Sequence, residues 1–256
     1  TGQRMVVLVH GSWCEALVWR SAPSMTNQAR EFAQMGFVAI VPDFYEPPAC
    51  TGNVDTAFRQ GMIDDILSLM TYLRTNAAVF GASSSKIALL GQSAGGQLAL
   101  MASIQGVAGG TKPNAVVCES PATRLDQTNF AAAGDHSGVG PYVENYLGLG
   151  ADEPSTTGAA IARAVSPYDQ AVSTMCPQLI IGSLTEPNIG IPASHFTDMH
   201  QTALSKGVDS TLKIYAGTAH ADFFWKAAGS SSWTRPSTIP SRRASRMRLK
   251  GDMEWK

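Results

Sequence analysis

The stretch Ile87-Ala88-Leu89-Leu90-Gly91-Gln92-Ser93-Ala94-Gly95-Gly96-Gln97-Leu98-Ala99-Leu100 decides the fold. It begins with an apolar run short enough for a buried parallel strand, and its last residues open an apolar pattern with helical spacing. The turn between them has the pattern Gly-x-Ser-x-Gly, which holds its serine in a strained conformation with the hydroxyl projecting. The stretch therefore predicts a strand, a sharp turn and a helix, with Ser93 as a nucleophile. The alternative is a chance glycine-rich turn between a strand and a helix.

Strand-like and helix-like segments alternate on both sides of this stretch. Besides the helix after Ser93, we expect strands at 5–9, 37–41, 87–90, 115–119, 177–182 and 212–215 and helices at 24–35, 55–75 and 194–206. Such alternation predicts an α/β fold, a mostly parallel sheet of about six strands with helices on both faces. Ligands of such sheets bind beyond the carboxyl ends of the strands.

The chain suits a single catalytic domain at residues 1–228, with one insertion and one tail. Residues 124–168 lack a strand signal and are interpreted as a cap insertion over the site. Its larger side chains either line a substrate pocket or pack as an ordinary irregular segment; they are Phe130, Tyr142, Tyr146, Leu147 and Leu149. Residues 229–256 hold seven Arg and Lys against two acidic residues, and they predict a basic, extended or disordered tail.

Composition excludes several classes of protein. Charged residues are 15% of the 256, against about a quarter in average proteins, and no apolar run is long enough to span a membrane. Residues 1–228 carry 12 basic and 18 acidic side chains. An acidic body without base-stacking motifs argues against nucleic-acid binding. The oligomeric state is left open.

Four cysteines bear on the cellular location. Cys14 and Cys50 each follow a predicted strand and would pair if those strands are neighbours, whereas Cys118 and Cys176 are expected to be buried thiols. A disulfide would favour an extracellular protein whose leader has been removed, because disulfides persist in oxidising compartments. The given sequence opens directly on a predicted strand and so shows no targeting segment that would indicate a location. The location is otherwise left open.

A serine hydroxyl needs a base to take its proton, and the base needs a carboxylate to orient it. His220 lies in a loop of small residues after the last predicted strand, and we expect it to be the base. Glu186 follows the preceding strand and is the expected acid. Glu119, at the end of an earlier strand, is the rival acid, because such triads are defined by geometry rather than by sequence position.

The other histidines have different expected roles. His10 precedes a loop that would meet the Ser93 turn, and it is expected to be structural. His136 lies in the cap insertion, where gating and a solvated position are the alternatives. His195 and His200 are five residues apart on a predicted helix, which splits them between faces and argues against a metal site.

An oxyanion hole would complete the site. The backbone N–H of Ala94, at the start of a helix, and that of Ser12, in the first loop, are the expected donors, with the N–H of Trp13 as the alternative to that of Ser12. Trp13 either walls a substrate pocket or packs under the loop.

With these residues in place, the chain resembles the α/β-hydrolase superfamily over about residues 4–228. His10-Gly11-Ser12-Trp13 is similar to its oxyanion loop, Gly91-Gln92-Ser93-Ala94-Gly95 to its nucleophile turn, residues 179–186 to the segment that ends in its acid, and His220 to its final loop. Within the superfamily, residues 36–45 look like dienelactone-hydrolase-like members and residues 83–96 like carboxylesterases.

The resemblance implies a serine esterase. A dienelactone hydrolase would carry cysteine at the nucleophile position, so Ser93 favours an ordinary ester. Glu186 stands where the superfamily more often has aspartate, the superfamily's first two strands are missing, and the basic tail matches no known pattern.

We therefore expect a cofactor-free hydrolase of small carboxylic esters. Short acyl groups are favoured because no extended apolar lid helix is evident. The alternatives are an amidase, formamidase, peptidase or lyase on the same fold, and a binding protein without catalysis, since fold does not dictate function.

Overall fold

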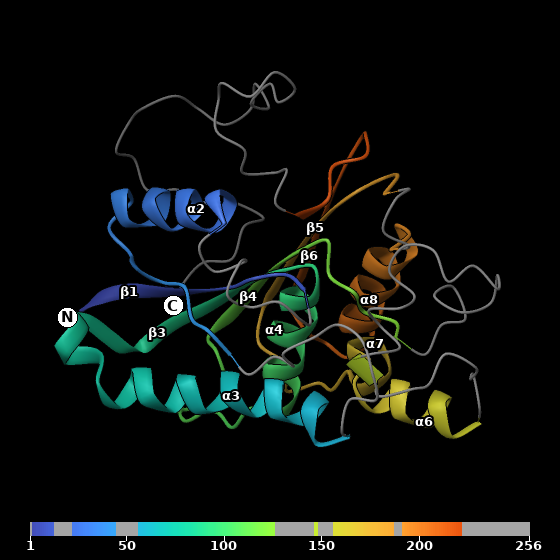
Figure 1. Cartoon of the computed structure of the whole chain (residues 1–256), viewed down its shortest axis with the longest axis horizontal. Helices are drawn as coiled ribbons and strands as arrows, with labels where there is room; N and C mark the ends of the chain where they lie inside the picture. The colour runs from blue at the N-terminus through green and yellow to red at the C-terminus, as the bar shows by residue number, and fades with distance from the viewer. Residues whose placement is uncertain are drawn as a thin grey trace.

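A computed structural model describes residues 2–12, 22–44, 56–125, 146–147, 156–186 and 191–221. Strands and helices alternate through these ranges, as the sequence predicts (Figure 1). In chain order the elements are β1 (Gln3–Val9), α2 (Pro23–Gln34), β2 (Val38–Ile40), α3 (Thr56–Thr75), the 3-10 helix η1 (Ala77–Phe80), β3 (Ala82–Gln92), α4 (Ala94–Gln105), β4 (Ala115–Glu119), α6 (Thr156–Ala164), α7 (Pro167–Gln170), β5 (Gln178–Ser183), α8 (Ser194–Ser205) and β6 (Ser210–Tyr215).

The strands form one six-stranded sheet in the order β2-β1-β3-β4-β5-β6. All neighbouring strands in it are parallel; Val7 of β1 pairs with Leu89 of β3, and Leu90 pairs with Val117 of β4. The predicted α/β fold with about six strands is confirmed. Because parallel strands point the same way, the segments that follow β3, β4, β5 and β6 all leave the same edge of the sheet.

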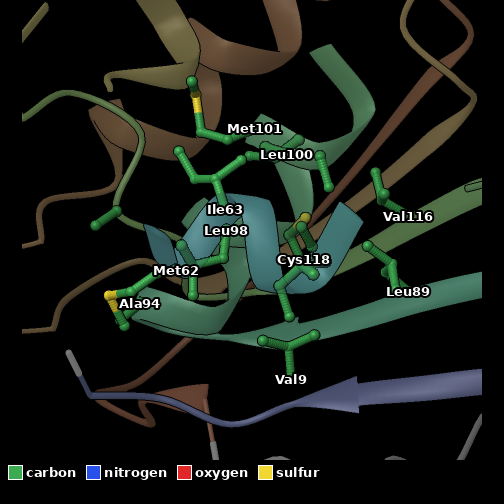
Figure 2. Close-up of a cluster of buried hydrophobic side chains, with 14 of the residues drawn as sticks. Val9, Met62, Ile63, Leu89, Ala94, Leu98, Leu100, Met101, Val116 and Cys118 are labelled. Carbon is green, nitrogen blue, oxygen red and sulfur yellow. The ribbon is translucent and has the colours of Figure 1, made fainter. Parts of the chain in front are cut away.

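Helices cover both faces of this sheet (Figure 1). On one face, Met25 of α2 packs against Val6, Leu8 and Leu90. On the other face, side chains of α3 and α4 meet those of three strands, as Figure 2 shows. The strand residues labelled there are Val9, Leu89, Val116 and Cys118. Alternate residues of one strand therefore serve two cores, which explains why the central strands are continuous apolar runs.

β3 extends furthest beyond its predicted range. β3 begins at Ala82, which pairs with Gln3, whereas the apolar run that predicts the strand begins at Ile87. Residues 83–86 are Ser-Ser-Ser-Lys, and their side chains are half-buried or exposed. The pairing of Ala82 with Gln3 extends the strand past an irregularity in the register, without any apolar pattern to signal it.

Most of the predicted cap insertion, and all of the predicted tail, lie outside the described residues, so both stay predictions. Tyr146 and Leu147 are described, and both are buried in the main core. The Tyr146 hydroxyl accepts a hydrogen bond from Gln97 Nε2 at 3.1 Å, and the Leu147 carbonyl accepts one from Arg59. For these two residues the structure shows packing in the core.

In the ranges that the structure covers, no helix is both long and apolar enough to cross a membrane.

Candidate active site

Ser93 occupies the turn between β3 and α4 with φ 52° and ψ −116°. A positive φ is uncommon for residues other than glycine and persists only where the surroundings hold it. Here the Ser93 N–H donates to the Glu119 carbonyl at 2.8 Å, and the Ser93 carbonyl accepts from Gly96 N–H at 3.0 Å and Gln97 N–H at 3.2 Å. The predicted strained turn is confirmed.

Two glycines let the turn close. A Cβ on Gly91 would lie 2.1 Å from the Gly95 carbonyl oxygen, and a Cβ on Gly95 would lie 2.2 Å from the Val9 oxygen and 2.4 Å from the His10 oxygen. These are backbone atoms of the sheet, the turn and the first loop, so they cannot swing aside as a flexible side chain can. Close approach of the backbone therefore explains both glycines of the motif.

The loop after β1 lies against this turn. A Cβ on Gly11 would come within 3.2 Å of the Ser93 Cβ, and the next residue, Ser12, has a left-handed φ of 75°. Ala94 is the first residue of α4, so its N–H has no acceptor within the helix. The structure thus brings Ala94 and the loop that carries Ser12 to Ser93; their use as oxyanion donors stays a prediction. Trp13 lies outside the described residues.

His10 is buried beside that loop. Its ring is fully buried and stacks on Phe44 with the ring centroids 4.3 Å apart. Its Nδ1 lies 2.9 Å from the Gly11 carbonyl oxygen. A carbonyl can only accept, so the proton is on Nδ1. This contact within the turn agrees with the structural role expected for His10.

The predicted base and acid meet. His220 Nδ1 lies 2.6 Å from Glu186 Oε2, so the ring donates its Nδ1 proton to the carboxylate and keeps Nε2 as a proton acceptor. The Glu186 side chain is completely buried, while 12% of the His220 side chain is exposed. The ring is therefore reachable by a substrate and the carboxylate is not.

Two further donors hold the acid. Glu186 Oε1 accepts from the Ser120 hydroxyl at 2.7 Å and from the Ser183 N–H at 3.1 Å. Sequence reasoning did not single out Ser120. The available signal was its position directly after the buried strand β4, at the edge where the site was expected.

Glu119, the rival acid, binds side chains of α2 and β3 instead of His220. Its carboxylate is buried and accepts from Gln28 Nε2 of α2 and from Gln92 Nε2 of β3, both at 3.1 Å. Alternation along β4 places Glu119 on the same face as Val117, which packs with the α2 cluster. Of the two acids, the structure brings Glu186 to His220.

The loop after β6 carries His220 back across the sheet toward Ser93. It crosses β5, because the Thr185 N–H donates to the Gly217 carbonyl at 3.1 Å, and it reaches β4, because the Ala221 N–H donates to Ser120 Oγ at 3.0 Å. β4 is the neighbour of β3, and its last residue accepts the hydrogen bond from Ser93 N–H. The His220–Glu186 pair and the Ser93 turn therefore belong to one region at the carboxyl-terminal edge.

The family model described as BD-FAE matches residues 1–185, which is more than half of the chain. The chain belongs to the BD-FAE family. The matched segment of this BD-FAE chain includes Ser93 and the first loop, and it ends one residue before Glu186. The pairing of Glu186 with His220 is therefore an observation of the structure.

Solved structures similar to this BD-FAE chain include several esterases. An acetyl ester-xyloside bifunctional hydrolase from Caldicellulosiruptor lactoaceticus has 15% sequence identity and a TM-score of 0.64, with 86% of this chain and 75% of that chain covered. Esterase Est2 of the Planctomycetes species Thermogutta terrifontis, with propionate bound, has 21% identity and a TM-score of 0.63, with 89% and 76% covered. The same esterase phosphonylated by sarin has 21% identity and a TM-score of 0.62, with 87% and 75% covered.

These likenesses confirm the α/β-hydrolase fold of the BD-FAE chain. No curated protein sequence gives a significant match.

The remaining histidines of the BD-FAE chain have separate partners where they are described. His195 is buried, and its Nδ1 accepts from the Thr123 N–H at 3.1 Å. His200 Nδ1 lies 2.9 Å from Ser210 Oγ. His195 and His200 therefore contact different residues, and His136 lies outside the described residues.

Two of the four cysteines are described, and both are buried free thiols, as predicted. Burial raises the pKa of Cys118 and raises that of Cys176 to about 11, so neither is a thiolate near neutral pH. Cys14 and Cys50 lie outside the described residues, and their pairing stays a prediction.

His195 predicts a loss of stability in acid. Burial, aided by the charge of Arg124, lowers the pKa of His195 from 6.5 to about 3. Unfolding lets the ring bind a proton below pH 6.5, so its contribution is complete above that pH and is lost as the pH falls toward 3. We expect the free energy of unfolding to drop between pH 7 and pH 5 by about 2 kcal/mol more in the unaltered protein than in His195→Gln, measured by urea unfolding.

The matched control is His200→Gln. Burial lowers the pKa of His200 as well, but its ring is only partly buried, so the change should be smaller. If the free energy of unfolding of His195→Gln depended on pH as it does in the unaltered protein, the loss of stability in acid could not be assigned to His195.

Proposed function

We propose that this chain is a serine hydrolase of carboxylic esters, with Ser93 as nucleophile, His220 as base and Glu186 as the acid that orients it. The observation that carries the proposal is the 2.6 Å hydrogen bond from His220 to the buried Glu186. It lies at the sheet edge that also holds the strained Ser93 turn. Membership of the BD-FAE family and the α/β-hydrolase fold support it.

In the first half-reaction, His220 Nε2 takes the proton of the Ser93 hydroxyl while the oxygen attacks the ester carbonyl carbon. The carbonyl oxygen becomes an oxyanion, to which the N–H groups of Ser12 and Ala94 donate. When the carbon–oxygen bond to the alcohol breaks, His220 returns the proton to the leaving alkoxide. An acyl group then remains on Ser93.

In the second half-reaction a water molecule takes the place of the alcohol. His220 accepts a proton from the water, the hydroxide oxygen attacks the acyl carbon, and the bond to Ser93 breaks as the serine recovers its proton. The net change is one ester and one water converted to one acid and one alcohol. Glu186 stays ionised throughout and stabilises the charged ring.

We propose short acyl groups as the preferred substrates and no bound cofactor. One similar esterase structure holds propionate, and another similar structure is that of an acetyl ester-xyloside hydrolase. Trp13 is proposed to line the substrate pocket. The substrate is a small molecule, in keeping with the exposed edge of the His220 ring.

The direct experiment compares p-nitrophenyl acetate, butyrate and octanoate with acetyl p-nitroanilide. We expect kcat/KM to be highest for acetate or butyrate, at least tenfold lower for octanoate, and lower still for the anilide. A preference for octanoate would refute the short-acyl proposal, and faster cleavage of the anilide would make the enzyme an amidase. No turnover of any ester, together with no labelling of Ser93 by a fluorophosphonate, would refute the proposal that this protein is a serine hydrolase.

The identity of the acid gives a second prediction. Glu186→Gln is expected to lower kcat by about 10²–10⁴-fold, because an uncharged side chain stabilises neither the required tautomer nor the imidazolium. Glu119→Gln should instead lower the free energy of unfolding by about 1–3 kcal/mol, because it replaces one of the two accepting oxygens with an amide donor that faces the donor of Gln28 or Gln92. Steady-state kinetics and urea unfolding of both variants test this prediction. A larger loss of kcat in Glu119→Gln than in Glu186→Gln would make Glu119, and not Glu186, the acid that orients His220.

A further inference from the structure

Ser120 follows β4 directly and has an unusual backbone. Its φ is 48°, in the left-handed region that residues other than glycine rarely adopt, and it is completely buried. Its N–H donates to the Ile181 carbonyl of β5 at 2.7 Å, which joins the ends of β4 and β5 at the site. A strained residue held so firmly at this edge points to a role in the site.

The hydroxyl of Ser120 contacts both halves of the His220–Glu186 pair. It donates to Glu186 Oε1 at 2.7 Å, and it accepts from the N–H of Ala221, the residue after His220, at 3.0 Å. A serine hydroxyl has one proton to give and lone pairs to accept, so both bonds form at once. From these contacts we infer that Ser120 is a positioning residue, which fixes the acid and the histidine loop relative to each other; the inference rests on the proposed function.

The contacts of the carboxylate explain why this bond matters. Oε2 accepts the hydrogen bond from His220 Nδ1, and Oε1 is held by Ser120 and by the Ser183 N–H at 3.1 Å. Without the hydroxyl, a single backbone donor would hold Oε1, and the buried carboxylate could turn away from the ring. Hydrogen bonds to a charged acceptor are stronger than neutral ones, so the Ser120 bond is well suited to lock this orientation.

The histidine loop needs the same support. Ala221 has φ 32°, again in the left-handed region, so the chain after His220 is strained where its N–H meets Ser120. Loss of the hydroxyl would leave that N–H without its acceptor. One side chain therefore holds two segments that arrive from different strands, the strained one after β6 and the one after β5 that carries Glu186.

The test uses Ser120→Ala and Ser120→Gly in the full chain, with p-nitrophenyl acetate as substrate. Both variants lack the hydroxyl, but glycine removes the cost of the positive φ. We expect kcat to fall about 10- to 100-fold in both, with KM changed by less than about threefold, because a misplaced base slows chemistry rather than binding.

A spectroscopic readout separates positioning from packing. The Nδ1 proton of a histidine bonded closely to a carboxylate gives a far-downfield proton resonance, identified here by its absence from His220→Ala. We expect this resonance to shift or broaden in Ser120→Ala and Ser120→Gly.

The matched control is Ser103→Ala. Ser103 is equally buried and its hydroxyl also accepts a backbone N–H, that of Cys176 at 3.0 Å, but it lies ten residues along the chain from Ser93, near the far end of α4. This variant should keep kcat within about threefold and leave the downfield resonance in place.

Other outcomes of these experiments would contradict either the role of the Ser120 hydroxyl or the proposed function. Full activity in Ser120→Gly with a loss only in Ser120→Ala would mean that backbone strain, not the hydroxyl, sets the rate. An equal loss of kcat in Ser103→Ala would reduce the effect to general packing, and failure of both Ser120 variants to fold would make Ser120 a residue of the fold rather than of the site. Absence of ester hydrolysis in the unaltered protein would instead refute the proposed function itself.

Discussion

Ser93→Ala is expected to lower kcat for p-nitrophenyl acetate by about 10⁴–10⁶-fold while the protein stays folded. The proposed reaction passes through a bond between Ser93 Oγ and the acyl carbon, and alanine has no atom that can form it. The turn itself should survive, because its hydrogen bonds use the backbone of Ser93 rather than its hydroxyl. Alanine and serine also meet the same cost at φ 52°.

Steady-state kinetics, mass spectrometry after fluorophosphonate treatment and urea unfolding together test this prediction. The unaltered protein should gain one phosphonyl group and Ser93→Ala none, with unfolding free energies within about 0.5 kcal/mol of each other. Ser103→Ala serves again as the control and should be labelled normally. Labelling that persists in Ser93→Ala, or activity within tenfold of the unaltered protein, would show that another residue is the nucleophile.

Gly95→Ala is expected to have the largest effect on stability, a loss of about 4 kcal/mol or more. The added methyl would lie 2.2 Å from the Val9 carbonyl oxygen and 2.4 Å from that of His10, well inside van der Waals contact. α4 could admit it only by moving away from β1, and that movement would part the Ser93 turn from the first loop. Activity should therefore be lost along with stability.

The control for this substitution is Gly61→Ala. Gly61 lies within α3, and a Cβ there would have no atom within 4 Å. Alanine in a helix interior is favoured over glycine, so this variant should be more stable by about 0.5–1 kcal/mol. Urea unfolding of both variants measures the contrast; a Gly95→Ala protein as stable as the original would mean that β1 and α4 do not pack as closely as the structure shows.

Much of the fold could be predicted from local patterns. The strands around Leu89 and Val116 show clear apolar runs because they are buried, and the helix at residues 55–75 shows a clear apolar period because it buries one face. The start of β3 could not, since residues 83–86 are polar and lie where the register with β1 is irregular, between the pairs Gln3–Ala82 and Met5–Ile87. Pairing energy comes from the partner strand, which a local pattern does not contain.

The candidate site could also be predicted in part. Ser93 is signalled by five consecutive residues, because a strained turn demands glycine at particular neighbouring positions. Glu186 and His220 were candidates by their order after the last two strands, with Glu119 as an open rival. Ser120 was not predicted, because nothing around it in the sequence announces a hydroxyl that bonds to residues 66 and 101 positions away.

Spacing and turn chemistry among near neighbours fix the strand, turn and helix around Ser93, the alternation of elements and therefore the parallel sheet. Which carboxylate meets His220 depends instead on contacts between distant segments. Glu119 ends β4 and Glu186 follows β5, but the first faces α2 and the second faces the loop after β6. The side of the sheet that each side chain faces, and the loop that crosses there, depend on strand order and packing between segments far apart in the chain.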